Sequence, residues 1–294
     1  MMSLFNELRN AYKNGGYLTR LIYINVIIFF LIRGIDVILF LMGLPMGTIL
    51  NYLALPNDLG LLLYRPWTLV TYMFVHYSFF HILSNLLFLY WFGRIFLQYL
   101  NQKKLLSTYI IGGICGGLLY LIAFNSLGVF SQSNSILLGA SAAVFAIVVA
   151  TAVYAPNYQL YLMFIGPVRI KYIALFYIAL STILITSNNA GGNIAHLGGA
   201  LWGYLFIHFL KKGKDIGSWI YPILDKIIHI FSSSSKNMKV KYRRSASDMD
   251  DQQYNINKKS KEKETNRILD KIAKSGYDSL TQEEKNHLFK MGKK

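Results

Sequence analysis

The feature that most constrains the fold is a series of long apolar segments. A membrane-spanning helix needs about 20 consecutive apolar residues, because the hydrocarbon core of a bilayer is about 30 Å thick. The polar breaks between the segments contain Gly, Pro, Asn and Ser, which interrupt helices. The sequence therefore predicts an all-α fold, a polytopic membrane helix bundle with six transmembrane helices, at roughly residues 21–43, 71–97, 105–124, 137–155, 171–187 and 193–210.

The composition supports a membrane protein. Hydrophobic residues make up 54% of the chain and charged residues only 15%, whereas a soluble domain carries about a quarter charged residues. The single cysteine, Cys115, cannot form an internal disulfide and does not indicate a metal site. We therefore expect no metal and no cofactor.

Positive charge predicts the orientation of the bundle. The chain has a net charge of +16, and loops rich in Lys and Arg usually face the cytoplasm. The loops on the opposite side contain one basic residue, Arg65. A basic flank of this kind favours contact with anionic lipids over nucleic acid. We expect a multi-pass protein of the plasma or inner membrane with both termini cytoplasmic, since the basic residues beside the segments are Arg9, Lys13, Arg20, Arg94, Lys103, Lys104, Arg169 and Lys171.

Two charged residues interrupt the first apolar segment. Arg33 and Asp36 lie three positions apart, and ionisable groups at membrane depth are costly enough to indicate a functional site. The alternative is an ion pair between neighbouring turns of one helix, facing the bundle interior. The ion pair is the favoured interpretation.

The sequence divides into four regions. Residues 1–16 are predicted to be a cytoplasmic N-terminal segment, and residues 17–212 the membrane domain. Residues 213–264 are basic and resemble a largely disordered cytoplasmic linker. Residues 265–294 fit a small helical hairpin whose function the sequence leaves open between a docking element and a solvated hairpin.

The hairpin has clear end signals. Gly276 is expected to end its first helix, and Thr281 with Glu284 is expected to form a capping box at the start of the second. The residues expected to share a small apolar face are Ile268, Leu269, Ile272, Leu288 and Phe289.

Polar residues of three predicted helices gather near the external surface. His81 and Asn85 lie in the second segment, Ser141 in the first turn of the fourth and His196 in the first turn of the sixth. Each has a structural explanation, because small residues and helical histidines commonly serve helix packing and interhelical hydrogen bonds. Those explanations do not account for the similar depth of these four residues below the external membrane surface.

A catalytic serine with a histidine base would explain why these residues lie at a similar depth. A serine hydroxyl needs an adjacent base, and a neutral histidine such as His196 is the usual one for a nucleophile such as Ser141. Gly199 and Gly203 permit close approach of their helix. Negative charge on an attacked carbonyl oxygen could be stabilised by His81, Asn85 and backbone N–H groups of the fourth helix.

The motifs "HYSFFHILSN", "GASAAVFA" and "AHLGGALWG" resemble those of the rhomboid family of intramembrane serine proteases. The resemblance covers about residues 17–212. It implies a dyad of Ser141 as nucleophile and His196 as general base, with His81 and Asn85 as oxyanion-hole side chains.

The resemblance also implies supporting residues. Phe145 occupies the position of an aromatic ring that packs on the catalytic histidine, and Gly199 and Gly203 match glycines that bring the last helix against the fourth. Gly139 precedes the serine within its motif, and His76 opens the motif of the second segment.

Two positions depart from the usual family pattern. The serine is followed by Ala142 instead of glycine. Trp67 is followed by Thr68 instead of arginine, which leaves the anchoring of the first external loop undefined.

The resemblance implies an endopeptidase that cleaves single-pass membrane proteins near the external membrane face. One alternative is a catalytically inactive relative that binds or dislocates membrane proteins, although such relatives have typically lost the serine or histidine. A six-span transporter is less favoured, because we find no internal repeat and few polar residues at the midplane.

Overall fold

The computed structural model describes residues 6, 12, 15–131, 133–162, 165–231 and 251–291. The chain forms two compact units, Met1–Phe231 and Ser232–Lys294, here called the bundle unit and the tail unit and considered separately. Most of the predicted N-terminal segment, 1–16, lies outside the described residues.

Each of the six apolar segments contains a helix. Of the helices described, α2, α6 and α7 are long and apolar enough to cross a membrane, whereas α8 and α9 are apolar but shorter. The helical membrane fold is thus supported, and the six-span topology remains a prediction. The main helices are α2 (Tyr17–Leu41), α6 (Phe79–Tyr99), α7 (Gln102–Ser126), α8 (Ser141–Tyr154), α9 (Ile170–Ile183) and α10 (Ala190–Lys211).

Short elements connect these helices. Two small antiparallel sheets pair β1 with β2 and β3 with β4, neither of which the sequence predicted. The second apolar segment was expected to be helical from residue 71, but α6 begins only at Phe79, where Ser78 Oγ accepts a hydrogen bond from His81 N. The connecting elements are α3 (Thr48–Leu53), β1 (Leu55–Pro56), α4 (Leu59–Tyr64), α5 (Thr68–Thr71), η1 (Tyr72–Phe74), η2 (Gly128–Phe130), β2 (Ile136–Leu137), β3 (Gln159–Leu162), β4 (Gly166–Arg169) and η3 (Leu184–Thr186).

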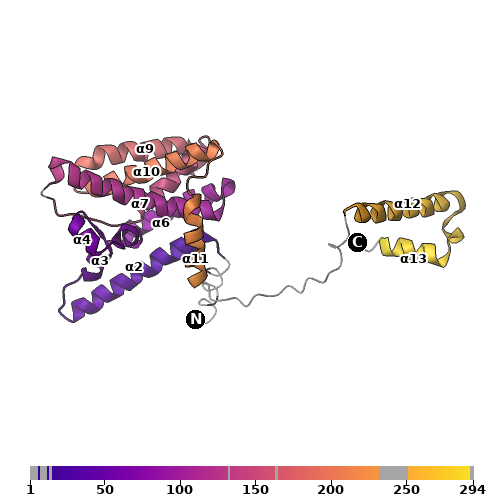
Figure 1. Ribbon diagram of the computed structural model, residues 1–294, viewed down its shortest axis with the longest axis horizontal. Helices are drawn as coiled ribbons and strands as arrows, with labels where there is room; N and C mark the ends of the chain where they lie inside the picture. The colour runs from indigo at the N-terminus through magenta and orange to yellow at the C-terminus, as the bar shows by residue number, and fades with distance from the viewer. Residues whose placement is uncertain are drawn as a thin grey trace. The chain divides into compact units, whose positions relative to one another are not determined.

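Helix α10 packs against α7, α8 and α9, and Figure 1 shows α7, α9 and α10 running side by side. A methyl group added to Gly199 would collide with the carbonyl oxygen of Ala142, and one added to Gly203 with that of Ala146. A methyl group on Gly198 would lie 2.6 Å from the carbonyl oxygen of Cys115 on α7. The backbones of α8 and α7 approach α10 this closely because Gly198, Gly199 and Gly203 carry no side chain.

The loop before α6 is anchored without the arginine that usually follows Trp67. Trp67 Nε1 donates to the carbonyl of Tyr52 at 3.2 Å, and the guanidinium of Arg65 lies 5.0 Å from the centre of the Tyr52 ring. Thr71 Oγ1 donates to the carbonyl of Leu53 at 2.7 Å. Buried Tyr72 donates from its hydroxyl to the carbonyl of Gly113 at 2.6 Å, which fixes this loop to α7.

The two charged residues of α2 contact each other in the described bundle. Arg33 and Asp36 form an ion pair at 3.2 Å, with the Asp36 side chain only 8% exposed. The other carboxylate oxygen of Asp36 accepts a hydrogen bond from Gly47 N at 2.9 Å. The ion pair is therefore confirmed, although the Arg33 side chain is 36% exposed and only Asp36 is buried. Asp36 additionally holds the turn after α2.

The predicted linker, 213–264, is helical over much of its described length. Helix α11 (Tyr221–Phe231) follows η4 (Ser218–Ile220), and α12 (Asp251–Ser275) begins well before the predicted hairpin. The structure has these helices where the sequence predicted a largely disordered linker, and 232–250 lies outside the described residues. Two ion pairs link α7 to the segment that follows α10, Lys103 with Asp225 at 2.8 Å and Lys104 with Asp215 at 3.3 Å.

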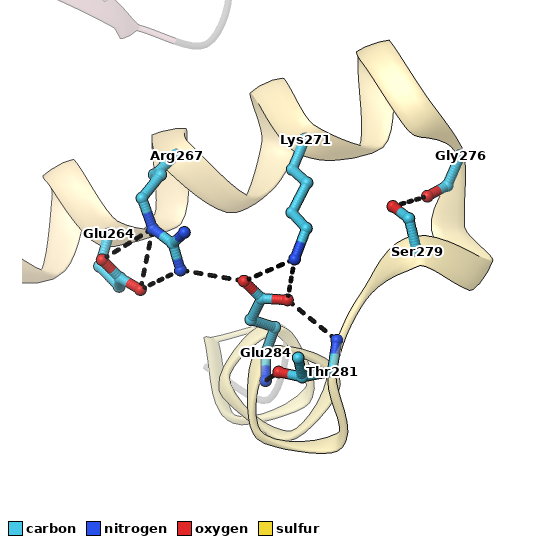
Figure 2. A network of polar contacts seen from close by, with 7 residues as sticks. All are labelled: Glu264, Arg267, Lys271, Gly276, Ser279, Thr281 and Glu284. Carbon is cyan, nitrogen blue, oxygen red and sulfur yellow. Dashed lines mark hydrogen bonds and ion pairs between the residues drawn. The ribbon is translucent and has the colours of Figure 1, made fainter.

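The tail unit joins α12 to α13 (Gln282–Met291) through η5 (Tyr277–Ser279). The predicted capping box is confirmed: Thr281 N donates to Glu284 Oε2 at 2.9 Å, and Glu284 N donates to Thr281 Oγ1 at 3.3 Å. Gly276 ends α12 with a φ of 76°. The capping carboxylate of Glu284 also binds Arg267 at 2.9 Å and Lys271 at 2.8 Å on α12 (Figure 2).

The apolar face of the hairpin differs from the prediction. Ile268 is buried, but Leu269 is 50% exposed, so Leu269 is not part of a shared core. Leu280, which was not predicted, is buried. Ile272 and Leu288 are half-buried, and the side chain of Phe289 lies outside the description.

Replacing Gly199 by alanine tests the α8–α10 contact. We expect Gly199→Ala to lower the free energy of unfolding by about 1–3 kcal/mol, because the new methyl group must push the two backbones apart. Gly34→Ala is the matched control, since no atom lies within 4 Å of a methyl group placed there. Thermal unfolding in detergent would measure both, and equal stability of the two variants would contradict the packing account.

The Glu284 network makes the hairpin sensitive to acid. Its hydrogen bond from Lys271, and then that from Thr281 N, lowers the pKa of Glu284 from an ordinary 4.5 to about 2. Since the pKa is lower in the folded state, the stabilisation is complete above about pH 4.5 and is lost as the pH falls toward 2. Hydrogen exchange of α13 amides in the full chain should accelerate over this range.

The variant Glu284→Gln should accelerate exchange in α13 already at neutral pH and weaken its pH dependence. Glu283→Gln is the matched control, because Glu283 is exposed in the same helical turn. Equal exchange in the two variants would show that the network does not hold the hairpin together.

Candidate active site

A cavity of about 590 Å³ lies between α6, α8, α9 and α10. Its lining includes the four predicted catalytic residues, His81, Asn85, Ser141 and His196, together with Phe145. The structure therefore brings side chains from three helices, far apart in the sequence, to one hollow. Other polar or aromatic residues on its wall are Tyr77, Ser84, Phe88, Tyr177, Ser181, Asn189 and Asn193.

Ser141 is the first residue of α8. The sequence predicted Ser141 in the first turn of its helix, which is confirmed, but the helix starts later than residue 137 because the preceding residues form a turn and the short strand β2. The first bond to a carbonyl four residues back runs from Val144 N to Ala140 O at 2.9 Å. Amides at the start of a helix have no such partner, so the N–H groups from Ser141 to Ala143 carry the positive end of the helix dipole.

His76 organises the turn before Ser141. Ala140 N donates to His76 Nε2 at 3.3 Å, and Gly139 N donates to the carbonyl of Tyr72 at 2.9 Å. His76 is almost fully buried. These bonds from the turn hold the start of α8 in place, and they occupy the Ala140 amide, which is therefore not free for a ligand.

Gly139 has two reasons to be glycine. Its φ is 116°, a backbone conformation that other residues rarely adopt. A methyl group there would also lie 2.6 Å from His81 Nε2. The His81 ring in turn meets the His76 ring edge-on, with centres 5.0 Å apart. The imidazole of His81 is thus held against the turn that leads into Ser141.

Asn85 lies one turn after His81 on α6 and is buried. Its side-chain amide donates to the carbonyl of His81 at 2.8 Å. A primary amide has two N–H groups, so one remains for a ligand in the cavity.

His196 is held by contacts from two other helices. Its ring stacks on Phe145 of α8, with ring centres 4.4 Å apart and planes 10° from parallel, as the resemblance implied. Its Nδ1 lies 3.1 Å from Ser181 Oγ on α9. The histidine lies six residues after the start of α10, about 9 Å along the helix, and not in the first turn as predicted.

In the described part of the chain, no hydrogen bond joins Ser141 to His196, although both line the cavity. Helix α8 and helix α10 are in backbone contact one residue after Ser141 and three residues after His196, at the Ala142–Gly199 contact. The two side chains therefore start from neighbouring points of packed helices.

Among the cavity residues that were not predicted from the sequence, Ser181 and Asn193 make hydrogen bonds between elements. Ser181 lies beside Thr182 in a mostly apolar helix, and the sequence pattern does not distinguish one hydroxyl from the other. Asn193 donates from its side chain to the carbonyl of Leu184 at 2.7 Å and joins the start of α10 to the end of α9. The "SNNAGG" segment directly before Asn193 indicated only a loop. Nothing in the sequence pattern identified Ser181 as a residue of the site.

The cavity shows no arrangement for a metal ion. Among the residues that the structure describes, no group of three or more His, Cys, Asp or Glu side chains could hold one. The chemistry available to the site is that of hydroxyl, imidazole, amide and backbone N–H groups.

A double-mutant cycle tests the contact between Gly139 and His81. We expect Gly139→Ala to destabilise the bundle by about 1–3 kcal/mol, through backbone strain and the collision with the imidazole. Gly166→Ala introduces strain alone, because its φ is 89° and no atom lies within 4 Å of the added methyl group. Adding His81→Ala should recover part of the loss at Gly139 and none at Gly166; additive effects at both positions would refute the contact.

Comparison with known proteins agrees with this architecture. Residues 64–213, about half of the chain, match the Rhomboid domain family, and residues 250–294 match DUF6576, a family of unknown function. The chain is 32% identical over 161 residues to the RHOMBOID-like protein 12, mitochondrial, of Arabidopsis thaliana. The aligned region covers 51% of this chain and 48% of that protein. The chain thus spans about half the length of this curated relative. These matches and the helical bundle show that the chain is a membrane protein that belongs to the rhomboid family.

Proposed function

We propose that this rhomboid family member is an intramembrane serine endopeptidase. Ser141 is the nucleophile, His196 is the general base, and the substrates are single-pass membrane proteins cleaved near the external membrane face. The observation that carries the proposal is the shared cavity, where a serine at a helix start and a histidine of a packed neighbouring helix meet His81 and Asn85.

In the first step His196 takes the hydroxyl proton of Ser141 while Oγ attacks the peptide carbonyl carbon. The Nδ1 atom of His196 is already within hydrogen-bond distance of Ser181, which leaves Nε2 to receive this proton. The imidazolium then protonates the departing amine, and the acyl group remains on Oγ. Water, activated by the same imidazole, releases the acyl group and restores the serine.

The negative charge on the attacked carbonyl oxygen needs donors that are already in position. The first-turn amides of α8 supply them, beginning at Ser141, because the Ala140 amide is bonded to His76. The second N–H of Asn85 and the imidazole of His81 can add side-chain donors from α6. The helix dipole of α8 has its positive end at the same point.

The membrane setting is part of the proposal. We place six helices across a plasma or inner membrane, with both termini and the basic tail cytoplasmic, on the strength of the charge distribution. A substrate helix must unwind locally before its peptide bond reaches the cavity, since its amides are hydrogen-bonded within the helix. Lipids surround the bundle, and the proposed reaction uses only groups of the protein and water.

Cleavage of a model single-pass protein in reconstituted membranes tests this function. Ser141→Ala and His196→Ala should each lower the cleavage rate by about 10³-fold or more, because the nucleophile and its base act as a unit. His208→Ala is the matched control, since His208 lies on the same helix and stacks on Tyr204. It should cleave within about twofold of the native chain.

Equal cleavage by the native chain and both dyad variants would remove the enzymatic interpretation. It would favour a family member that binds membrane proteins without cleaving them. Thermal unfolding of each variant should accompany the assay, so that a loss of activity is not confused with a loss of fold.

A further inference from the structure

A hydroxyl on α9 meets the imidazole of α10 inside the bundle. Ser181 is only 4% exposed, and its Oγ lies 3.1 Å from Nδ1 of His196. A buried hydroxyl without a partner is costly, so such groups are nearly always hydrogen-bonded. Here the partner is the side chain proposed as the general base.

We infer that Ser181 is a positioning residue for His196, which holds its imidazole as the tautomer with the proton on Nδ1. This inference rests on the proposed function for its catalytic meaning. The contact itself is a property of the chain whether or not the protein cleaves a substrate.

The tautomer decides whether the imidazole can act as a base. A neutral imidazole carries one N–H and one free lone pair. If Nδ1–H donates to Ser181 Oγ, then Nε2 keeps its lone pair and can take the proton of Ser141. With the opposite tautomer Ser181 donates to Nδ1, and Nε2 carries a proton and cannot act as a base. The reactive form is therefore the one in which Ser181 accepts the bond from Nδ1–H, and this is the form that we assign.

A neutral hydroxyl suits this position in an apolar bundle. When His196 gains a proton, both of its nitrogens donate, and Ser181 can accept from Nδ1–H throughout the cycle. A carboxylate would do the same but would bring a second charge into a buried site, where desolvation is costly. Ser181 orients the ring without that charge.

Two contacts from different helices then fix the orientation of the His196 imidazole. Stacking on Phe145 fixes the plane of the imidazole, and the Ser181 bond fixes the direction of Nδ1 within that plane. Tyr177, one turn before Ser181, meets the Phe145 ring edge-on with centres 6.1 Å apart. The position of α9 is therefore linked to the orientation of the base.

Nitrogen NMR of the full chain in nanodiscs, with ¹⁵N-labelled histidine, tests the tautomer without any need for activity. His196→Ala would identify the resonances. The native chain and Ser181→Thr should show a protonated Nδ1 and a bare Nε2, and Ser181→Ala should lose this preference. A protonated Nε2 in the native chain, or the same tautomer in Ser181→Ala, would overturn the inference.

Steady-state cleavage tests the catalytic consequence. Ser181→Ala should lower kcat by about 10-fold or more with KM within about twofold, and Ser181→Thr should restore most of the rate. Thr182→Ala is the matched control, because the neighbouring hydroxyl is exposed and bonds to the carbonyl of Ile178 on its own helix. An unchanged kcat in Ser181→Ala would overturn the positioning role.

The two measurements separate this inference from the proposed function. If the native chain cleaves nothing but shows the Ser181-dependent tautomer, the proposed protease activity fails and the positioning contact stands. If the chain cleaves normally and Ser181→Ala changes neither tautomer nor kcat, only the inference fails.

Discussion

The close contact between α8 and α10 is the constraint on which the candidate site depends. Gly199 and Gly203 lie directly against the carbonyls of Ala142 and Ala146, so the two backbones touch where side chains would normally separate them. Because Ser141 precedes this contact by one residue and His196 by three, the same packing that stabilises the bundle brings both into one cavity. Any residue larger than glycine at these positions would widen the distance between hydroxyl and imidazole.

The start of α8 depends on parts of the chain far away in sequence. Leu55 and Pro56 pair with Leu137 and Ile136, and Asn57 accepts a hydrogen bond from Ser135 N at 3.0 Å. The loop before α6 thereby holds the strand that leads into the Gly139 turn. This arrangement lets Ser141 stand at a helix terminus, where amides are free, instead of inside a helix, where they are occupied.

Hydropathy and charge were sufficient to predict helices in the right segments, because burial in lipid imposes a strong and simple pattern on the sequence. The motifs around Ser141, His196, His81 and Asn85 identified residues that do line one cavity. The helix ends were less predictable: α8 begins at Ser141 because of the Gly139 turn and the β1–β2 pairing, neither of which hydropathy can register.

Contacts made by tertiary packing were the least predictable part of the site. Ser181 and Thr182 are adjacent hydroxyls in an apolar segment, yet one bonds to His196 and the other to its own helix. Only the rotation of α9 about its axis distinguishes them. In the tail, the capping box of Thr281 and Glu284 was predictable from spacing, whereas the ion pairs that Glu284 makes across the hairpin depend on how α12 and α13 pack.

The central claim is that the contact between the two helices turns Ser141 into a nucleophile with His196 as its base. Reaction with a serine-directed fluorophosphonate, followed by mass spectrometry of the intact protein and its peptides, tests this claim most directly. The account predicts a single adduct on Ser141 that disappears when His196 is replaced by alanine. An unmodified Ser141, or an adduct that forms equally well without the imidazole, would contradict it.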